Sequence, residues 1–232
     1  MKKKLLVLIP AYNEEQSICK TVEGLLPYLQ EGWDYIVVND GSRDHTAKIC
    51  REHKYRLLDL PVNLGLTGAF LTGMKYALQE GYECVVQFDG DGQHRPEYLA
   101  AMMKQLEDEQ LDIVIGSRFV NDAKPQSLRM LGSNLISLAI RLSSGKRISD
   151  PTSGMRMFAH GMIEQFCKNY NYGPEPDTIA FLIRCGAKVG ECQVRMDERS
   201  AGTSYLNLSR SIYYMVNMMI SILMVQFFRN RH

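Results

Sequence analysis

"LLVLIPAYNEE", residues 5–15, is an apolar run that ends in a polar turn. Its apolar part, residues 5–9, has the length of a buried β-strand and is shorter than the roughly 7–15 apolar residues of a signal-peptide core. Apolar residues then recur on one helical face, at Ile18, Val22, Leu25, Leu26 and Leu29. A strand, a polar turn and an amphipathic helix in this order are the building block of an α/β protein.

The same order repeats along the first half of the chain. Further apolar runs alternate with segments of helical period and cover residues 35–39, 55–60, 84–88 and 112–116. This alternation predicts an α/β fold in which a mostly parallel sheet is flanked by helices, and such sheets bind ligands at the carboxyl ends of their strands. Polar or glycine-rich segments follow the first four runs, at residues 10–15, 39–44, 62–69 and 89–94. We therefore expect a site at that edge of the sheet.

The pattern loosens from about residue 117. A helix is predicted near residues 126–144, and the polar segments 149–158 and 173–177 follow it. We expect this half to build the second side of the site. The sequence contains no internal repeat, and we predict one main domain over residues 1–205 with a C-terminal helix within 206–232.

The composition is that of an ordinary folded protein. Of the 232 residues 45% are hydrophobic and 23% charged. The net charge of +1 lacks the strong positive excess that is typical of nucleic-acid-binding proteins. The six cysteines contain no CxxC pair, so we interpret them as reduced thiols in the cytoplasm. One large α/β domain with an appendage fits this length.

The segment "FDGDGQH", residues 88–94, places two aspartates directly after the fourth apolar run. Asp-Gly pairs form turns, and a turn is the commoner explanation of such a pair in isolation. At the carboxyl end of a buried strand, Asp89 and Asp91 would instead face one hard cation, with Gln93 and His94 within reach. A calcium loop of EF-hand type is excluded, because His94 stands where that loop needs glycine. The pattern favours Mg²⁺ or Mn²⁺ held together with substrate phosphates.

A diphosphate-bearing substrate also needs a pocket for its nucleoside. Asp40 follows the second apolar run and would accept hydrogen bonds from ribose hydroxyls or a base N–H, and Glu14 would do so from the neighbouring strand end. Helix capping by Asn13 or Asp44 is the alternative explanation of these loops. The segment 62–69 matches neither a dinucleotide-binding fingerprint nor a Walker P-loop, and a glycine-aided turn explains it equally well.

Five motifs occur in a characteristic order and spacing: "PAYNEE", "VVNDGSRDHT", "NLGLTGA", "QFDGDGQHRPE" and "GSRF". Together they resemble the family 2 glycosyltransferases of GT-A fold, particularly the polyprenyl-phosphate glycosyltransferases related to dolichol-phosphate mannose synthase. The resemblance covers about residues 5–205, and it is the combination of motifs that is specific. It implies inverting, metal-dependent transfer of a hexose from a nucleotide sugar to polyprenyl (undecaprenyl) phosphate for cell-envelope glycan synthesis. The donors considered are UDP-glucose, UDP-N-acetylglucosamine and GDP-mannose.

The resemblance also implies residue roles. The donor nucleotide is expected to bind at Pro10, Tyr12, Glu14, Asp40 and Asp89. Mg²⁺ or Mn²⁺ is expected on the diphosphate at Asp89, Asp91 and Gln93. The lipid phosphate is expected at Arg118 and Arg129. A mobile loop that closes over the donor is expected to carry Arg199 and Ser204.

The candidates for catalysis are Asp91, Arg118 and Asp150. The chemistry of sugar transfer agrees with the roles given above. A phosphate acceptor is already anionic at neutral pH, so arginines suffice to position it and no strong general base is required. A sugar hydroxyl on a growing polysaccharide would need a carboxylate base, for which Asp150, Glu175 and Asp177 are candidates.

Less specific explanations exist for the same residues. Asp150 would also suit a turn and Glu175 the first turn of a helix, while an arginine such as Arg118 is commonly a solvated or ion-paired surface charge. Two other functional classes remain open. A sugar nucleotidyltransferase usually has a glycine-rich basic loop after its first strand, where this chain has "PAYNEE", and a non-catalytic nucleotide-sugar-binding protein would not need intact metal ligands.

The C-terminal segment 212–228 carries no charge and has arginines on both flanks. As a helix it would span roughly 25 Å, short of a hydrocarbon core of about 30 Å. Its polar stripe consists of Arg210, Asn217 and Ser221. We predict a helix that lies in or dips into the cytoplasmic leaflet, or that contacts a small integral membrane protein, in a chain peripheral to the inner face of the membrane. A helix buried on the protein's own domain is the alternative, and homo-oligomerisation is open.

Overall fold

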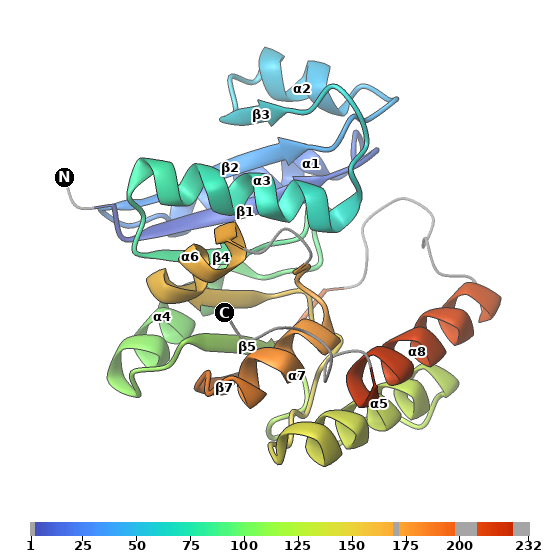
Figure 1. Ribbon diagram of the computed structural model, residues 1–232. Helices are drawn as coiled ribbons and strands as arrows, with labels where there is room; N and C mark the ends of the chain where they lie inside the picture. Colours follow the sequence, from blue (N-terminus) through green and yellow to red (C-terminus); the bar gives the residue numbers. More distant parts are fainter. Residues whose placement is uncertain (1–2, 169–171, 198–207, 225–232) are drawn as a thin grey trace.

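The fold is a seven-stranded sheet between two layers of helices (Figure 1). The computed structural model describes residues 3–168, 172–197 and 208–224, without the side chains of 128–129 and 208–212. The strands are β1 (Leu5–Ala11), β2 (Trp33–Asn39), β3 (Leu57–Asp59), β4 (Cys84–Gln87), β5 (Ile113–Ser117), β6 (Arg156–Ala159) and β7 (Val189–Gln193). Their spatial order is β3-β2-β1-β4-β6-β5-β7.

The sheet is mostly parallel, as the sequence predicts, but it is mixed. β1 pairs in parallel with β2 and β4, β2 with β3, and β5 with β7, whereas β6 runs antiparallel to both β4 and β5. The five predicted strands are confirmed within a few residues. β6 and β7 lie in the half of the chain where the apolar pattern loosens, and they complete the sheet beyond β4.

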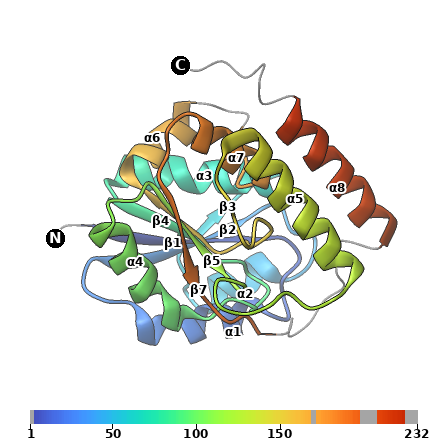
Figure 2. The same cartoon turned by 90° about the horizontal axis from the view of Figure 1, so that it is seen from below.

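The helices cover both faces of the sheet. They are α1 (Ile18–Leu25), α2 (Thr46–Glu52), α3 (Gly65–Glu80), α4 (Leu99–Asp108), α5 (Leu128–Ser144), α6 (His160–Lys168), α7 (Pro176–Arg184) and α8 (Leu208–Leu223), with short 3₁₀ turns at Leu26–Tyr28 and Pro96–Tyr98. Figure 2 shows α1, α2 and α4 on one side of the sheet, and α3, α6, α7, α5 and α8 on the other. The predicted helix near 126–144 is α5.

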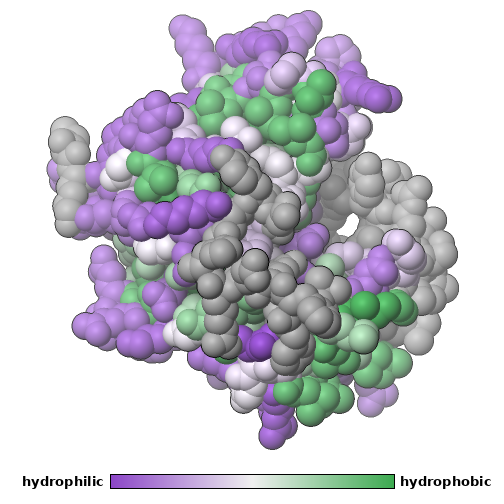
Figure 3. Space-filling model, viewed as in Figure 1, coloured by the Kyte–Doolittle hydropathy of each residue, from purple (hydrophilic) through white to green (hydrophobic). Residues whose placement is uncertain are grey.

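The C-terminal helix α8 packs against α5 and α7. Met218 and Ile222 of α8 are buried in the core, and Gly132 of α5 lies so close to Met215 that a Cβ there would overlap the Met215 sulfur. The opposite side of α8 is exposed and apolar, and Figure 3 shows hydrophobic residues gathered over α5 and α8. Among the described residues no helix is long and apolar enough to cross a membrane. The helix begins and ends earlier than the predicted 212–228, and residues 225–232 lie outside the described part.

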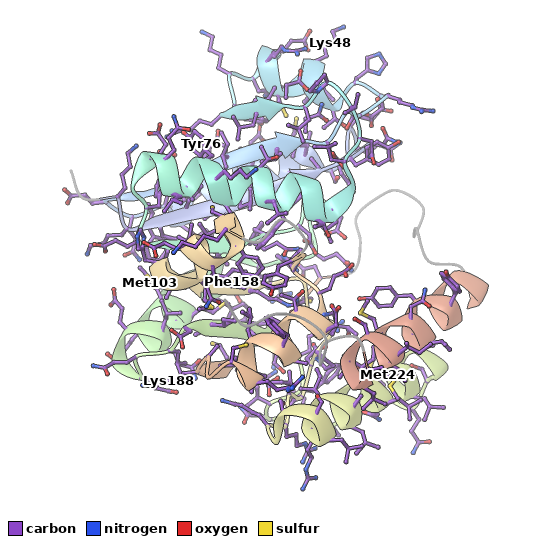
Figure 4. The ribbon with its side chains drawn as sticks, viewed as in Figure 1. Lys48, Tyr76, Met103, Phe158, Lys188 and Met224 are labelled. Atoms are coloured by element: carbon purple, nitrogen blue, oxygen red, sulfur yellow. The ribbon has the colours of Figure 1, made fainter. Side chains whose placement is uncertain are left out.

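Two apolar cores follow from the alternation of side chains along the strands. On one face, Phe158 of β6, which is labelled in Figure 4, packs edge-to-face with Phe70 of α3 and Phe166 of α6. The ring-centroid distances are 5.6 and 5.2 Å. On the other face, residues such as Val86 and Met157 pack under α1 and α4. The sheet is therefore rigidly supported on both sides, and its strand ends are free to carry a site.

Candidate active site

One edge of the sheet collects the predicted motifs. β1, β2, β4, β5 and β7 end at this edge, and antiparallel β6 begins there. The loops that follow the parallel strands therefore meet the segment 149–155, which leads into β6. This geometry confirms the prediction that the polar segments after the strands converge.

The two loops expected to bind the nucleoside are joined to each other. The Asn13 side-chain oxygen accepts a hydrogen bond from the backbone N–H of Arg43 (2.9 Å), and the Asn13 backbone N–H donates to the Ser42 hydroxyl (2.9 Å). Asn13 has a positive φ of 57°, which asparagine tolerates better than most residues. The backbone N–H of Glu14 donates to Thr46, while the Glu14 carboxylate accepts from the Ser17 hydroxyl (2.6 Å).

The Asp44 side chain stabilises the start of α2, in line with the helix-capping explanation of this loop. Its Oδ1 accepts hydrogen bonds from the N–H and the hydroxyl of Thr46, at 2.9 and 2.6 Å. Its Oδ2 accepts from the N–H of Glu15 (3.1 Å), and the hydrogen bonds from His45 lower the pKa of the Glu15 carboxyl. The 11–15 and 39–46 loops thus form one preorganised wall.

Asp40 is buried at the end of β2, with 3% of its surface exposed. Its Oδ1 accepts a hydrogen bond from the backbone N–H of Leu64 (2.7 Å), which fixes the 62–65 loop that begins α3. Gly41 has a φ of +61°, and a Cβ there would lie 2.5 Å from the Val62 carbonyl carbon. Only glycine allows this approach, so the "NDG" and "NLG" motifs act as a pair. The second carboxylate oxygen of Asp40 has no hydrogen bond among those described.

Asp89 follows β4 and is held by side chains on both sides. Gln87 donates its amide N–H to Asp89 Oδ1 (3.0 Å). The backbone N–H of Asp89 donates to His94 Nδ1 (2.9 Å), which leaves the His94 proton on Nε2, 3.6 Å from Asp89 Oδ2. A Cβ on Gly154 would overlap Asp89 Oδ2, so the carboxylate lies directly against the loop that precedes β6. His94 therefore orients Asp89 in this structure.

Asp91 and Gln93 form the turn beyond Asp89. The Gln93 N–H donates to Asp91 Oδ1 (3.1 Å), and Gly92 has a φ of +76°. The Gln93 amide donates to the carbonyl of Asp197 (3.3 Å), and the Asp197 N–H donates back to the Gln93 carbonyl (2.9 Å). The turn predicted for this segment is thus present, and it is tied to the chain that follows β7.

The oxygen donors here suit Mg²⁺ or Mn²⁺. Asp89 keeps 36% of its side chain exposed, so its carboxylate is open to a cation. Within the described ranges no group of three or more His, Cys, Asp or Glu side chains is arranged to hold a metal. This fits a cation held by one or two carboxylates, whose other ligands are water and substrate phosphate oxygens.

Across the edge, Arg118 and Asp150 form a bidentate ion pair. Arg118 Nε and Nη2 donate to the two Asp150 oxygens at 2.7 and 2.9 Å. Asp150 is fully buried, and its backbone N–H, with that of Ser149, donates to the Glu191 carboxylate on β7. The Arg118 side chain is 23% exposed, and its Nη1 group takes no part in the pair with Asp150. Asp150 is therefore arranged to orient Arg118, and this suits it poorly to accepting a proton from a hydroxyl.

A cavity of about 250 Å³ lies beside this pair, between the loop after β5, helix α5 and residues 147–149. Lys124 and Arg147 line it with positive charge. Lys124 Nζ donates to Ser133 of α5 (3.1 Å), and burial lowers the pKa of Lys124. The hydroxyl oxygen of Ser137, also in the lining, is buried without a hydrogen-bond partner among the described atoms. The lining also contains one carboxylate, Asp122, so two cations and the Ser137 hydroxyl stand against a single negative charge. Such a set of groups can bind an anion.

The remaining carboxylates stand at the start of α7. Glu175 directly precedes the helix, and Asp177 is buried in its first turn. Asp177 Oδ2 accepts a hydrogen bond from Ser221 of α8 (2.6 Å), so Ser221 faces the domain. The terminal helix is thereby connected to the residues next to the site.

The model of the family described as Glycosyl transferase family 2 matches residues 6–166, which is more than half of the chain. The chain belongs to glycosyl transferase family 2. It is therefore a hexosyltransferase that uses a nucleotide-sugar donor. Its relatives include an undecaprenyl-phosphate mannosyltransferase of Micrococcus luteus, 30% identical over 217 residues and covering 88% of both chains. A UDP-N-acetylglucosamine–dolichyl-phosphate N-acetylglucosaminyltransferase of Methanococcus voltae is 30% identical over 182 residues, 70% of this chain and 72% of that protein.

Solved structures show the same fold. Glucosyl-3-phosphoglycerate synthase from Mycobacterium tuberculosis, in complex with Mn²⁺, UDP and glucosyl-3-phosphoglycerate, superposes with a TM-score of 0.68 and 16% identity over 99% of this chain and 81% of that one. At this identity the likeness establishes the GT-A-like fold of the glycosyltransferase and nothing about its substrate.

The predicted site residues of the glycosyltransferase are not all placed by the structure. Pro10 is the next-to-last residue of β1 and lies against Gly90, and Tyr12 follows the strand directly. Arg129 lies on α5 but its side chain is not described, and Arg199 and Ser204 lie outside the described residues. Sequence reasoning missed the supporting residues Gln87, Lys124, Arg156 and Glu191. A polar residue inside an apolar strand run was the available signal for Gln87 and Arg156.

Proposed function

We propose that this glycosyltransferase moves a hexose from a nucleotide sugar to the phosphate of a polyprenyl phosphate such as undecaprenyl phosphate, with inversion at the anomeric carbon. The observation that carries this proposal is the acceptor side of the site. Arg118 is fixed by buried Asp150 beside a cavity that holds Lys124 and Arg147. A guanidinium and an ammonium group suit a phosphate, which needs no base to become nucleophilic.

The relatives support the same acceptor class. Those from Micrococcus luteus and Methanococcus voltae are named for transfer to undecaprenyl phosphate and dolichyl phosphate. A polyprenol monophosphomannose synthase of Mycolicibacterium smegmatis is 27% identical over 217 residues, 88% of this chain and 81% of that protein. Because these names include both mannose and N-acetylglucosamine, we assign the sugar only as a hexose or its N-acetylated derivative.

On the donor side, Asp40 and Glu14 are proposed to bind the nucleoside, and Asp89 and Asp91 the diphosphate through a divalent cation. Asp40 is fixed by Leu64 and Asp89 by Gln87, so both carboxylates are preorganised. A bound Mg²⁺ or Mn²⁺ would supply electrostatic stabilisation of the charge that develops on the leaving nucleoside diphosphate. Gly90 lets this loop approach Pro10, because a Cβ there would lie 3.1 Å from the Pro10 carbonyl oxygen.

The transfer itself forms one bond and breaks one. An oxygen of the acceptor phosphate, oriented by Arg118, attacks the anomeric carbon from the face opposite the diphosphate. The bond from that carbon to the diphosphate oxygen breaks, and its electron pair leaves with the nucleoside diphosphate. No proton moves, so the saturated hydrogen bonding of Asp150 is compatible with the reaction.

The exposed apolar surface is proposed to rest on the membrane that contains the acceptor. One stripe on α5 consists of Leu131, Leu135, Leu138 and Leu142. A second on α8 consists of Tyr213, Val216, Ile220 and Leu223, with Met224 beyond it. Figures 1 and 2 both show the two helices side by side. Exposed Arg141, Lys146 and Arg147 at the end of α5 suit an anionic lipid surface.

Vesicle binding tests the membrane contact. The Leu138→Gln/Leu142→Gln double variant should bind sedimenting vesicles that contain anionic lipid at least fivefold more weakly than the wild type. Val62→Gln is the matched control, because Val62 is also an exposed apolar residue (57%) but does not belong to α5 or α8. This substitution should leave vesicle binding unchanged. Equal binding by all three proteins would refute this contact.

The acceptor is tested by offering three molecules in parallel: undecaprenyl phosphate, undecaprenol without phosphate, and a glycan primer. The full-length protein is assayed with Mn²⁺ and each labelled nucleotide sugar. We expect label only on the phosphate lipid. Label on the glycan primer alone would favour the rival function, glycosylation of a polysaccharide hydroxyl.

A further inference from the structure

Arg156 is a buried cation at the centre of the sheet. It is the first residue of β6, lies opposite Gln87 of β4 and Ile115 of β5, and is 2% exposed. Arginine is almost never fully buried unless it is paired, because removing its charge from water is costly. Its position directly under the carboxyl edge therefore requires an explanation that packing does not supply.

The guanidinium of Arg156 bonds to backbone carbonyls only. Nη2 donates to the carbonyl of Pro151 (2.7 Å) and Nη1 to that of Pro174. Nε is buried without a hydrogen-bond partner, and in the described ranges no carboxylate lies within ion-pair distance of Arg156. The guanidinium is thus held in place by backbone carbonyls and not by a direct ion pair.

The two carbonyls belong to loops that build the site. Pro151 follows Asp150, the partner of Arg118, and the same loop continues to Gly154, which touches Asp89. Pro174 precedes Glu175 and the start of α7. Arg156 therefore ties both sides of the site to the rigid centre of the sheet.

Acidic groups surround Arg156 without bonding to it. Burial lowers its pKa, and Tyr214, Asp89, Asp150 and Glu175 act in the opposite direction. Burial raises the pKa of the Tyr214 hydroxyl to about 12, so that group stays neutral and brings no counter-charge.

We propose that Arg156 is a positioning residue for the transfer reaction. It holds the loops 149–154 and 173–177 in the geometry that aligns Arg118 and Asp89, and its positive charge offsets the nearby carboxylates, which would otherwise repel anionic substrates. This inference rests on the proposed function, since the loops that Arg156 holds carry residues assigned there to the two substrates.

Two substitutions separate this role from simple packing. Arg156→Met removes the charge and both loop contacts, and Arg156→Lys keeps the charge with fewer hydrogen bonds. The control is Phe158→Leu on the same strand, which is fully buried but faces the aromatic core. If Arg156 served packing alone, Arg156→Lys should be less stable and less active than Arg156→Met, because it buries an unpaired charge.

We expect Arg156→Met to lower kcat at least tenfold and to leave KM for the donor within about threefold of the wild-type value. The kcat of Arg156→Lys should be at least fivefold higher than that of Arg156→Met. Phe158→Leu should lose thermal stability and keep kcat within twofold. The proposal is overturned if Arg156→Met keeps wild-type kcat, or if Arg156→Lys is no more active than Arg156→Met.

Hydrogen exchange of the full chain gives an independent readout. Amides of 149–154 and 172–177 should exchange faster in Arg156→Met and at the wild-type rate in Phe158→Leu. Unchanged exchange in both loops would overturn the positioning role even in an active enzyme. If instead the wild type transfers no sugar to polyprenyl phosphate, the proposed function fails, while faster exchange in Arg156→Met would still support the loop contacts.

Discussion

Gly154→Ala tests whether Asp89 stands in the active site. The three atoms nearest to a Cβ at position 154 all belong to the Asp89 carboxylate: Oδ2 would overlap it, and Cγ and Oδ1 would lie 3.1 and 3.2 Å away. Restoring ordinary contact requires the carboxylate to move by about 1 Å, and a displacement of that size at a catalytic group costs on the order of 100-fold in rate.

The substitution should act on the site more than on the fold. Gly154 has no positive φ, so alanine introduces no backbone strain, and the displaced group is the end of one side chain. We therefore expect kcat/KM to fall by about 100-fold, which is about 2.7 kcal/mol of transition-state stabilisation. Mn²⁺ affinity in the presence of nucleoside diphosphate, measured by electron paramagnetic resonance, should also fall.

Gly161→Ala is the matched control. Gly161 lies in α6, and a Cβ there meets nothing within 4 Å. Alanine should leave activity unchanged and stabilise the protein by up to about 1 kcal/mol, because it has the higher helix propensity. If Gly154→Ala keeps activity and Mn²⁺ affinity within twofold of the wild type, Asp89 does not have the role argued here.

Three further predictions concern other parts of the molecule. Asp150→Asn should lower the free energy of unfolding by about 3–5 kcal/mol in a denaturant titration, because it leaves the Arg118 guanidinium without its buried partner. A loss below about 1 kcal/mol would contradict the pairing. The lowered pKa of Lys124 means that its positive charge is lost on raising the pH sooner than for an ordinary lysine, so KM for the lipid phosphate should rise at alkaline pH. Lys124→Arg, which stays charged, should abolish that rise, and an identical pH profile in both proteins would refute the assignment. All six thiols are free, and burial raises the pKa of Cys84 to about 12, so alkylation of the native protein followed by mass spectrometry should modify exposed Cys185 and spare Cys84.

The first half of the fold could be read from the sequence because each strand there contains a short apolar run followed by a polar turn and a helical pattern. The second half could not. β6 begins with Arg156, a charge that breaks the apolar pattern, and its antiparallel direction depends on pairing with β4 and β5, which no local pattern records. β7 is half-exposed and contains Gly190, so it lacks the signature of a buried strand.

The candidate site shows the same division. The position of Asp40, Asp89 and Asp91 at the carboxyl edge was predictable, because each comes shortly after an apolar run. The residues that hold them come from distant positions: Leu64 for Asp40, and Gly154 for Asp89. Such contacts depend on tertiary packing, and a single sequence does not reveal them.

His94 and Asp150 illustrate how the structure refines a role. The sequence offered His94 as a further metal ligand, whereas its ring is engaged by the backbone and carboxylate of Asp89. Asp150 was considered as a base, and the structure surrounds it with donors from Arg118 and the neighbouring backbone. In the structure each of the two holds a neighbour: His94 holds Asp89, and Asp150 holds Arg118.

The mass of the product decides whether the acceptor is a lipid phosphate, as we propose. The full-length protein is incubated with undecaprenyl phosphate, Mn²⁺ and a mixture of nucleotide sugars, and the lipid fraction is analysed by mass spectrometry beside an Asp91→Asn variant. We expect a lipid heavier than undecaprenyl phosphate by one hexosyl or N-acetylhexosaminyl unit, formed by the wild type and absent with Asp91→Asn. An unchanged lipid, with the sugar found on a glycan hydroxyl instead, would contradict this proposal.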